Sequence, residues 1–207
     1  MKRLKRGVRK RVLRWTRPVR SLGEEQYGRL VDYHMHTRLC GHAIGEPEEY
    51  VRRAIELGLR EIGFSDHMPL LHARDERLTM SPDELPVYVE MIRELQESVD
   101  GVRVRLGIEM DYFPGRMDDI WEAARSYDFD YVLGSVHYID DWGFSDSRYV
   151  AHYEGRDPDE FHRRYFDLFC EAALEGGFDV MAHPDLIKKF GVNTNLPLQE
   201  LYETYRL

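Results

Sequence analysis

From Leu30 onward, the chain alternates between short apolar runs and longer segments whose apolar residues are three or four positions apart. Short continuous runs are typical of buried strands, and the longer spacing is typical of amphipathic helices. Strands are therefore expected at residues 30–36, 60–65, 102–110, 130–137 and 178–183. Helices are expected at residues 46–58, from Ser81 onward, at 117–125, at 157–176 and from Pro197 onward.

The regular alternation of strands and helices predicts an α/β fold with a parallel sheet. The strands are almost continuously apolar, which indicates that both faces of the sheet are covered. Periodicity alone leaves open whether the sheet closes into a barrel or stays open. A loop rich in glycine and aspartate is expected at residues 140–157.

The N-terminal segment differs in composition from the rest of the chain. Its first 20 residues contain ten lysines and arginines and no acidic residue. They also lack the apolar stretch of a secretory signal. We expect residues 1–29 to form a basic, disordered extension, and residues 30–207 to form one domain. A basic arm that binds RNA or anionic lipid and an organelle transit peptide are the alternatives.

Composition and charge exclude several classes of protein. The chain has 207 residues, of which 43% are hydrophobic, and this is enough to build one core. After residue 20 there are 19 basic and 38 acidic side chains, and so acidic a body argues against nucleic acid as a partner. No apolar run is long enough to span a membrane, and two cysteines suit a reducing cytoplasm. The oligomeric state is left open.

A potential metal ligand stands at the end of every predicted strand. These residues are His34, His36, His67, Glu109, His137 and His183. The carboxyl ends of parallel strands meet at one edge of the sheet, where α/β proteins place their functional sites. Residues two apart in a strand face the same side, so His34 and His36 can bind one ion. Glu109 would be a bridging ligand between two ions.

The cluster HMHTRLCGH adds His42 to this set. Imidazole and carboxylate together suit zinc, manganese or iron better than calcium or magnesium. Cys40 lies inside the cluster, where a small packed side chain is favoured over a zinc ligand. The other histidines, at positions 72, 152 and 162, are interpreted as surface residues. The motifs of serine hydrolases and of nucleotide-binding loops are absent from the sequence.

Five segments carry a family likeness in order and at fitting spacing: HMHTRLCGH, FSDH, GIEMD, GSVHYI and AHPDLIKKFG. Together they resemble the motifs of the polymerase-and-histidinol-phosphatase (PHP) superfamily, and within it those of the histidinol-phosphatase family. The likeness extends from about Val31 to the C-terminus. The resemblance implies a distorted (β/α)7 barrel with two to three divalent metal ions at the carboxyl ends of the strands.

The resemblance also implies a distribution of ligands. It places His34 and His36 on the first ion, Glu109 between the first and second, His137 and His183 on the second, and His42 and His67 on the third. Asp66 and Asp185 would orient the imidazoles without binding an ion themselves. The ions would supply a metal-bound hydroxide that attacks phosphorus. Lys188 and Lys189 are candidates for contact with the substrate phosphate, although a solvated turn is an equally good interpretation.

One part of the family pattern is missing. Members of the family continue to a Gly-Ser-Asp-x-His motif, whose Asp completes the first ion and whose His completes the third. These 207 residues lack that motif, so the barrel is expected to be C-terminally incomplete in this chain. We expect a fragment of a longer gene product that is poorly active alone. A missing part supplied by another chain is the alternative.

The resemblance implies a metal-dependent phosphatase of histidine biosynthesis that converts L-histidinol phosphate and water into L-histidinol and phosphate. One alternative is a PHP phosphoesterase that acts on another small phosphate ester or on a nucleotide. Another alternative, from a different class, is a truncated and inactive metal-binding module.

Overall fold

The computed structural model describes residues 30–70 and 77–197. The strands are β1 (Val31–Met35), β2 (Glu61–Phe64), β3 (Arg103–Asp111), β4 (Tyr131–Ser135) and β5 (Val180–Met181). The helices are α2 (Pro47–Glu56), α3 (Leu85–Ser98), α4 (Met117–Ala124) and α5 (Pro158–Glu175). Short 3-10 helices are η1 (Arg38–Cys40), η2 (Ser147–Tyr153) and η3 (Leu186–Lys188). The expected N-terminal extension, residues 1–29, lies outside the described residues, and so does the helix expected from Pro197 onward, apart from Pro197 itself.

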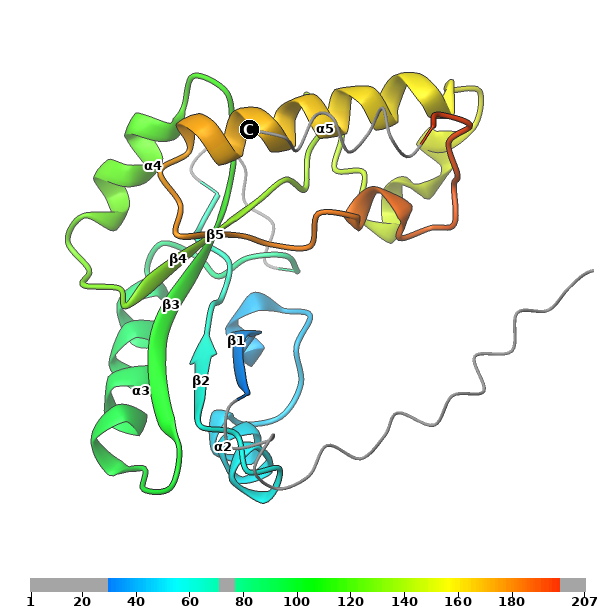
Figure 1. Ribbon diagram of the computed structural model, residues 1–207. Coiled ribbons are helices and arrows are strands. Elements are labelled where there is room, and N and C mark those ends of the chain that lie inside the picture. The colour runs from blue at the N-terminus through cyan, green and yellow to red at the C-terminus, as the bar shows by residue number, and fades with distance from the viewer. Residues whose placement is uncertain (1–29, 71–76, 198–207) are drawn as a thin grey trace, which may run out of the picture.

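The five strands form one parallel sheet in the order β1-β2-β3-β4-β5. Every strand therefore pairs with the next one along the chain, and the order never reverses as it does in a doubly wound sheet. Figure 1 shows the strands side by side with helices outside them. The parallel α/β fold predicted from the sequence is confirmed as a half-barrel of β/α units.

The helices begin and end where local chemistry predicts. Helix α2 starts with Pro47 in its first turn, and the side chains of Glu46 and Glu49 form a reciprocal capping box. Helix α5 starts in the same way at Pro158, after Asp157 accepts a hydrogen bond from the backbone of Asp159. Both helices therefore satisfy backbone groups that would otherwise lack partners.

Two elements differ from the sequence prediction. The helix expected from Ser81 begins at Leu85, because the Glu84 carboxylate accepts hydrogen bonds from the backbone and hydroxyl of Ser81 and closes a separate turn. The loop expected at 140–157 contains η2, whose first turn is capped by the side chain of Asp146. Polar side chains that bond to nearby backbone groups shape both segments.

The two larger apolar cores pack the helices against different parts of the sheet and its loops. The first packs α2, α3 and α4 against β2 and β3, with Ile62, Phe64 and Ile92 fully buried. The second packs α5 against the segment after β4, around Phe144 and Tyr165. These cores hold the strands rigidly, so side chains at their carboxyl ends are placed by the whole fold.

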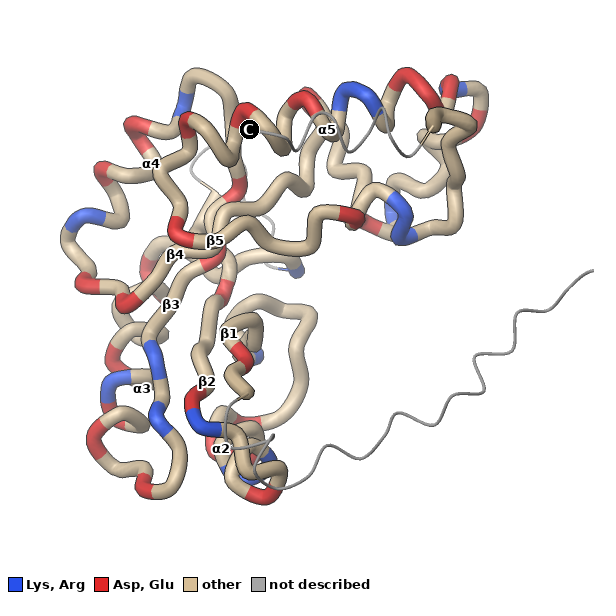
Figure 2. Tube along the Cα trace, viewed as in Figure 1, with Lys and Arg blue, Asp and Glu red and all other residues tan. Residues whose placement is uncertain are grey.

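The charged residues are spread over the outside of the helices. Figure 2 shows acidic and basic positions interspersed along α5. Among the described residues, no helix is both long and apolar enough to cross a membrane.

Candidate metal centre

The centre is built around the carboxylate of Glu109, which lies near the carboxyl end of β3 and is almost completely buried. Five imidazoles surround it. The distances to its oxygens are 2.9 Å from His34 Nε2, 3.2 Å from His36 Nε2, 3.5 Å from His67 Nδ1, 3.9 Å from His137 Nε2 and 2.9 Å from His183 Nε2. The residues expected at the strand ends are therefore brought together at one point.

The backbone explains this convergence. Beyond the end of β2, the chain continues beside β3, so that the backbone N–H of Glu109 donates to the carbonyl of Asp66 over 2.9 Å. The next residue, His67, then lies opposite Glu109 in a parallel bridge. His137 and His183 follow β4 and β5 by two residues each. Parallel strands in register thus deliver their C-terminal side chains to one edge.

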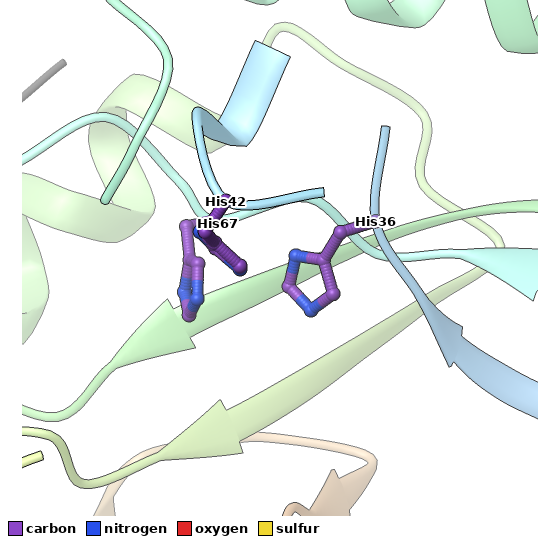
Figure 3. Close-up of side chains that lie close together, drawn as sticks. All are labelled: His36, His42 and His67. Carbon is purple, nitrogen blue, oxygen red and sulfur yellow. The ribbon is translucent and has the colours of Figure 1, made fainter. Parts of the chain in front are cut away.

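His42 joins the centre from the loop after η1, although it belongs to no strand. Its ring centroid is 5.0 Å from that of His36 and 5.3 Å from that of His67, and the rings of His36 and His67 are 4.8 Å apart. Figure 3 shows these three imidazoles facing one another. One nitrogen of each lies within 4.8 Å of the others, so the three can share one ion.

Among the described residues, three other groups can hold an ion, and two of them share a residue with this one. They are His34, Glu109 and His183; His67, Asp111 and His137; and His36, Cys40 and Asp66. His36 and His67 each belong to two groups. The structure thus associates His36 with His42 and His67 as well as with His34, the partner that the family pattern assigns to it.

The electrostatics of the centre favour the ligand forms of His67 and Glu109. Burial lowers the pKa of His67 to about 3, which leaves its imidazole neutral at neutral pH. Burial also acts to raise the pKa of Glu109, but the surrounding imidazoles, His67 first and then His183 and His34 through hydrogen bonds, hold that pKa well below its usual range. Glu109 is therefore an ionised carboxylate in a fully buried position.

Asp111 is a site residue that the sequence prediction missed. Its Oδ1 lies 2.7 Å from His137 Nδ1 and accepts a second hydrogen bond from the His137 backbone over 3.1 Å. Burial acts to lower the pKa of His137, but the charge and hydrogen bond of Asp111 raise it to about 8. The signal was present in the motif GIEMD, because Asp111 is two residues after Glu109 and shares its face of β3.

The two aspartates expected to orient imidazoles make no hydrogen bond to an imidazole ring among the described residues. The buried carboxylate of Asp66 accepts hydrogen bonds from the backbone and hydroxyl of Thr37, over 2.6 Å and 2.5 Å. It therefore holds the turn that follows His36 rather than an imidazole ring. Asp185 is exposed at the start of η3, and within the described part of the chain no hydrogen bond joins its side chain to a histidine.

The remaining histidines and cysteines partly agree with expectation. Cys40 is fully buried, as expected of a packed side chain, and His152 is exposed. The interpretation of His162 as a surface residue is wrong: it is completely buried, because the inner face of α5 carries it into the second core. His72 lies outside the described residues.

The two lysines have different surroundings. Lys188 and Lys189 are both exposed, at the end of η3. The charge of Lys189 acts to lower the pKa of His137, whereas that of Lys188 acts on His162. Of the two lysines, Lys189 is therefore the one whose charge acts on a proposed ligand of the candidate centre.

A pocket of about 750 Å³ opens beside the centre, and His67, Asp111 and His137 form part of its wall. Its other walls come from the segments after β2, β3 and β4. Aromatic side chains such as Trp142 and charged side chains such as Asp141 and Arg156 line it. The guanidinium of Arg156 stacks 4.4 Å from the centre of the Trp142 ring. A volume of this size is typical of sites for small molecules.

The donor set fits divalent metal ions. Several imidazole nitrogens point at one ionised carboxylate, and His67 Nδ1, which is one of them, is buried without a hydrogen-bond partner in the described structure. Buried polar atoms normally have a partner, and lone pairs that converge in this way acquire one when a cation binds. Nitrogen and oxygen donors together are the ligand set of zinc, manganese and iron.

A parallel α/β half-barrel with a histidine-rich, metal-binding type of site at the carboxyl ends of its strands defines the class of this protein. Within that class, the chain belongs to the PHP domain family, whose model matches residues 32–206. The family resemblance noted in the sequence is therefore confirmed.

Named relatives of the chain are similar over most of its length. A probable histidinol-phosphatase of Deinococcus radiodurans is 44% identical over 163 residues, which are 78% of this chain and 63% of the relative. The histidinol-phosphatase of Lactococcus lactis is 28% identical over 169 residues, which are 80% of this chain and 60% of the relative. The chain thus spans about three fifths of the length of these curated relatives.

Solved structures show the same fold. The Lactococcus lactis histidinol phosphate phosphatase, crystallised with zinc, L-histidinol and phosphate, is 26% identical and superposes with a TM-score of 0.71 over 84% of this chain and 65% of its own. A putative histidinol phosphatase of Listeria monocytogenes is 22% identical and superposes with a TM-score of 0.70 over 86% of this chain and 76% of its own.

Proposed function

We propose that this chain is the metal-binding part of a phosphoric monoester hydrolase whose substrate is L-histidinol phosphate. The observation that carries the proposal is the buried, ionised Glu109 with five imidazoles around it, at the edge of the sheet where a substrate-sized pocket opens. The Deinococcus relative and the zinc-bound Lactococcus structure support the same activity.

Seven residues are proposed to hold two to three divalent ions, which are zinc, manganese or iron. They are His34, His36, His42, His67, Glu109, His137 and His183. Glu109 is the proposed bridging ligand because its two oxygens face different imidazoles: Oε2 faces His34, and Oε1 faces His183. Asp111 holds the ring of His137 from behind, which keeps Nε2 of that ring free to bind.

The chemistry follows from these groups. Divalent ions, when bound, lower the pKa of a coordinated water and neutralise phosphate oxygens. The protein itself positions the ligands, because the strand ends fix their places. The neutral His67 adds no charge that would repel a cation. Lys189 is the better placed of the two lysines to contact a substrate phosphate, because its charge already acts on His137.

The pocket suits the alcohol part of the proposed substrate. Histidinol carries an imidazole ring and a cationic amine, and the pocket offers aromatic surfaces and carboxylates. Asp140 is paired with Arg164 and Asp146 with Arg148, whereas Asp141 has no ion pair within the described residues. The Asp141 carboxylate is therefore the proposed partner of the amine.

The finer description of the fold is also a proposal. The sequential strand order supports a distorted (β/α)7 barrel of which these strands form the first five. The matching family model supports residues 30–207 as one PHP-type domain that follows a basic extension at 1–29. The two edges of the described sheet, β1 and β5, are where such a barrel would continue.

The decisive experiment measures phosphate release by the purified chain with added zinc or manganese, using L-histidinol phosphate, p-nitrophenyl phosphate and a nucleoside monophosphate. We expect release to depend on metal and to favour histidinol phosphate. The rate should be low for the 207-residue chain, because the two ligands of the Gly-Ser-Asp-x-His motif are missing from it. A chain extended through that motif should be fully active.

Two variants separate the possible outcomes. Glu109→Gln should abolish activity, while Glu61→Gln removes a similarly buried carboxylate at the opposite end of the sheet, where Arg103 and Arg105 pair with it, and should leave metal dependence intact. Preference for the nucleotide would support a different PHP phosphoesterase. Metal binding without hydrolysis by either chain length would support an inactive binding module.

A further inference from the structure

Cys40 contacts three of the seven proposed ligands, although it stands outside the set. It is the last residue of η1, and its side chain is fully buried. Its Sγ lies 3.4 Å from His36 Nδ1 and accepts a hydrogen bond from the backbone N–H of His67 over 3.0 Å. Its carbonyl oxygen lies 2.9 Å from His42 Nδ1.

These contacts determine which ring nitrogen can bind an ion. A carbonyl oxygen only accepts, so the 2.9 Å contact requires a proton on Nδ1 of His42 and leaves the lone pair on Nε2. Sulfur is a weak acceptor, and a proton on His36 Nδ1 likewise leaves the lone pair on Nε2, the atom 3.2 Å from Glu109. One residue therefore selects the tautomer of two neighbouring imidazoles.

The thiol is itself held in place. The Asp66 carboxylate accepts from the backbone and hydroxyl of Thr37, and one of its oxygens lies within 4.8 Å of Cys40 Sγ. The Thr37 hydroxyl in turn accepts from the backbone N–H of Leu39 and caps η1. The sulfur accepts from the backbone N–H of His67, and this bond keeps it beside Nδ1 of His36.

We propose that Cys40 is a positioning residue that orients His36, His42 and His67 for one metal ion without binding the ion itself. This inference rests on the proposed function, because it assumes that the three imidazoles bind metal. It gives Asp66 its role as well, since that carboxylate acts on the imidazoles through Cys40 and the turn at Thr37.

The test compares Cys40→Ala, Cys40→Ser and the matched control Cys170→Ser, whose thiol lies on α5 away from the centre. Zinc affinity of the metal-free protein is measured by competition with a chromophoric chelator. Loss of a residue that orients metal ligands typically weakens binding roughly 10–100-fold. We expect a loss in this range for Cys40→Ala, a smaller loss for Cys40→Ser, whose hydroxyl can still accept and donate, and no change for Cys170→Ser.

Two spectroscopic readouts distinguish positioning from a general structural role. The ¹⁵N shifts of the His36 and His42 rings report their tautomers, and in Cys40→Ala the His36 ring should lose its single tautomer while His42, held by the carbonyl, keeps its own. Cobalt bound to the wild-type chain should show no thiolate charge-transfer band. Such a band would overturn the inference by making Cys40 a ligand.

The remaining outcomes separate this inference from the proposed function. A wild-type chain that binds no zinc would overturn both. A wild-type chain that binds zinc, together with a folded Cys40→Ala variant of equal affinity and an unchanged His36 tautomer, would overturn the positioning role alone. If Cys40→Ala fails to fold, Cys40→Val, which fills the buried space but can neither accept nor donate a hydrogen bond, carries the same two readouts, and an unchanged affinity and tautomer in that variant would overturn the role.

Discussion

At the scale of single residues, the centre depends on imidazoles whose non-binding nitrogen is held by a partner. Asp111 holds His137 in this way, and the backbone carbonyl of Cys40 holds His42. Partners of this kind fix the ring orientation and the tautomer, so they affect binding almost as strongly as the ligands do. The residues that hydrogen bond to the non-binding nitrogens are therefore good targets for mutation.

Asp111→Asn is expected to weaken binding of zinc or manganese roughly 10-fold, because an amide can still accept from His137 Nδ1 but supplies no charge. Asp111→Ala should weaken it further, toward roughly 100-fold. Isothermal titration of the metal-free protein measures both. Asp146→Asn is the control, because it removes a carboxylate of the neighbouring pocket that is paired with Arg148. Equal affinities in wild type and Asp111→Ala would contradict the role of Asp111.

His162 provides a prediction about pH that is independent of metal binding. Its Nδ1 donates to the carbonyl of Pro158 over 2.7 Å, and its buried Nε2 has no hydrogen-bond partner in the described structure. Burial lowers the pKa of His162 from its ordinary value of 6.5. Below that pH, the unfolded chain binds a proton that the folded chain does not, so the free energy of unfolding should fall as the solution becomes more acidic.

His162→Asn keeps a donor for the Pro158 carbonyl and removes the titrating group. Urea unfolding of metal-free wild type and variant, at several values between about pH 7.5 and 5, measures the difference. The wild type should lose stability more steeply, by at most about 1.4 kcal/mol per pH unit from this one proton. Parallel curves for the two proteins would show that His162 does not titrate as expected.

At the scale of elements, the strands approach closely because glycines leave space for one tyrosine ring. A Cβ on Gly107 would lie 2.2 Å from the Tyr131 ring, and one on Gly63 would lie 2.3 Å from the Tyr131 hydroxyl. That hydroxyl donates to the carbonyl of Tyr33 over 2.6 Å. Tyr131 therefore links β1, β2, β3 and β4 on one face of the sheet.

Gly107→Ala should destabilise the fold by about 1–3 kcal/mol, because the added methyl group must displace a buried ring. Urea unfolding measures this loss. In the double variant Gly107→Ala/Tyr131→Val the clash is relieved, so its total loss should be smaller than the sum of the two single losses. Additive losses would mean that the ring and the glycine do not interact as the structure shows.

At the scale of the whole molecule, the candidate centre joins all five strands. Its seven proposed ligands come from the end of every strand and from the loop after η1. An ion bound there would connect segments that are up to about 150 residues apart in sequence. Metal binding and stability of the fold should therefore be coupled.

Zinc or manganese at about 100 times its dissociation constant should stabilise the chain by about 2.7 kcal/mol. For a chain of this length, that corresponds to a rise in Tm of roughly 5–10 °C. Differential scanning calorimetry with metal and with a chelator measures the rise. Glu109→Gln should lose it, and Glu61→Gln should keep it even if its own Tm is lower. A rise of equal size in Glu109→Gln would place the ions elsewhere.

Much of the fold was predictable because it follows from local chemistry. The strand that contains His34 and the helix that starts at Pro47 are specified by apolar spacing and capping residues within a few positions. Errors occurred where polar side chains reshape the backbone locally, as at Ser81, and where one face of a long helix turns inward, as at His162.

The sequence alone determined the parallel α/β fold, the family, and which histidines and which glutamate stand at strand ends, because periodicity and motifs are local properties. Only the tertiary structure decided which residues outside the ligand set contact the ligands or the turns that carry them. Asp111 faces His137, Asp66 binds Thr37 rather than an imidazole, and Cys40 contacts three ligands. These pairings depend on strand register and on the path of loops, and no spacing within one segment encodes them.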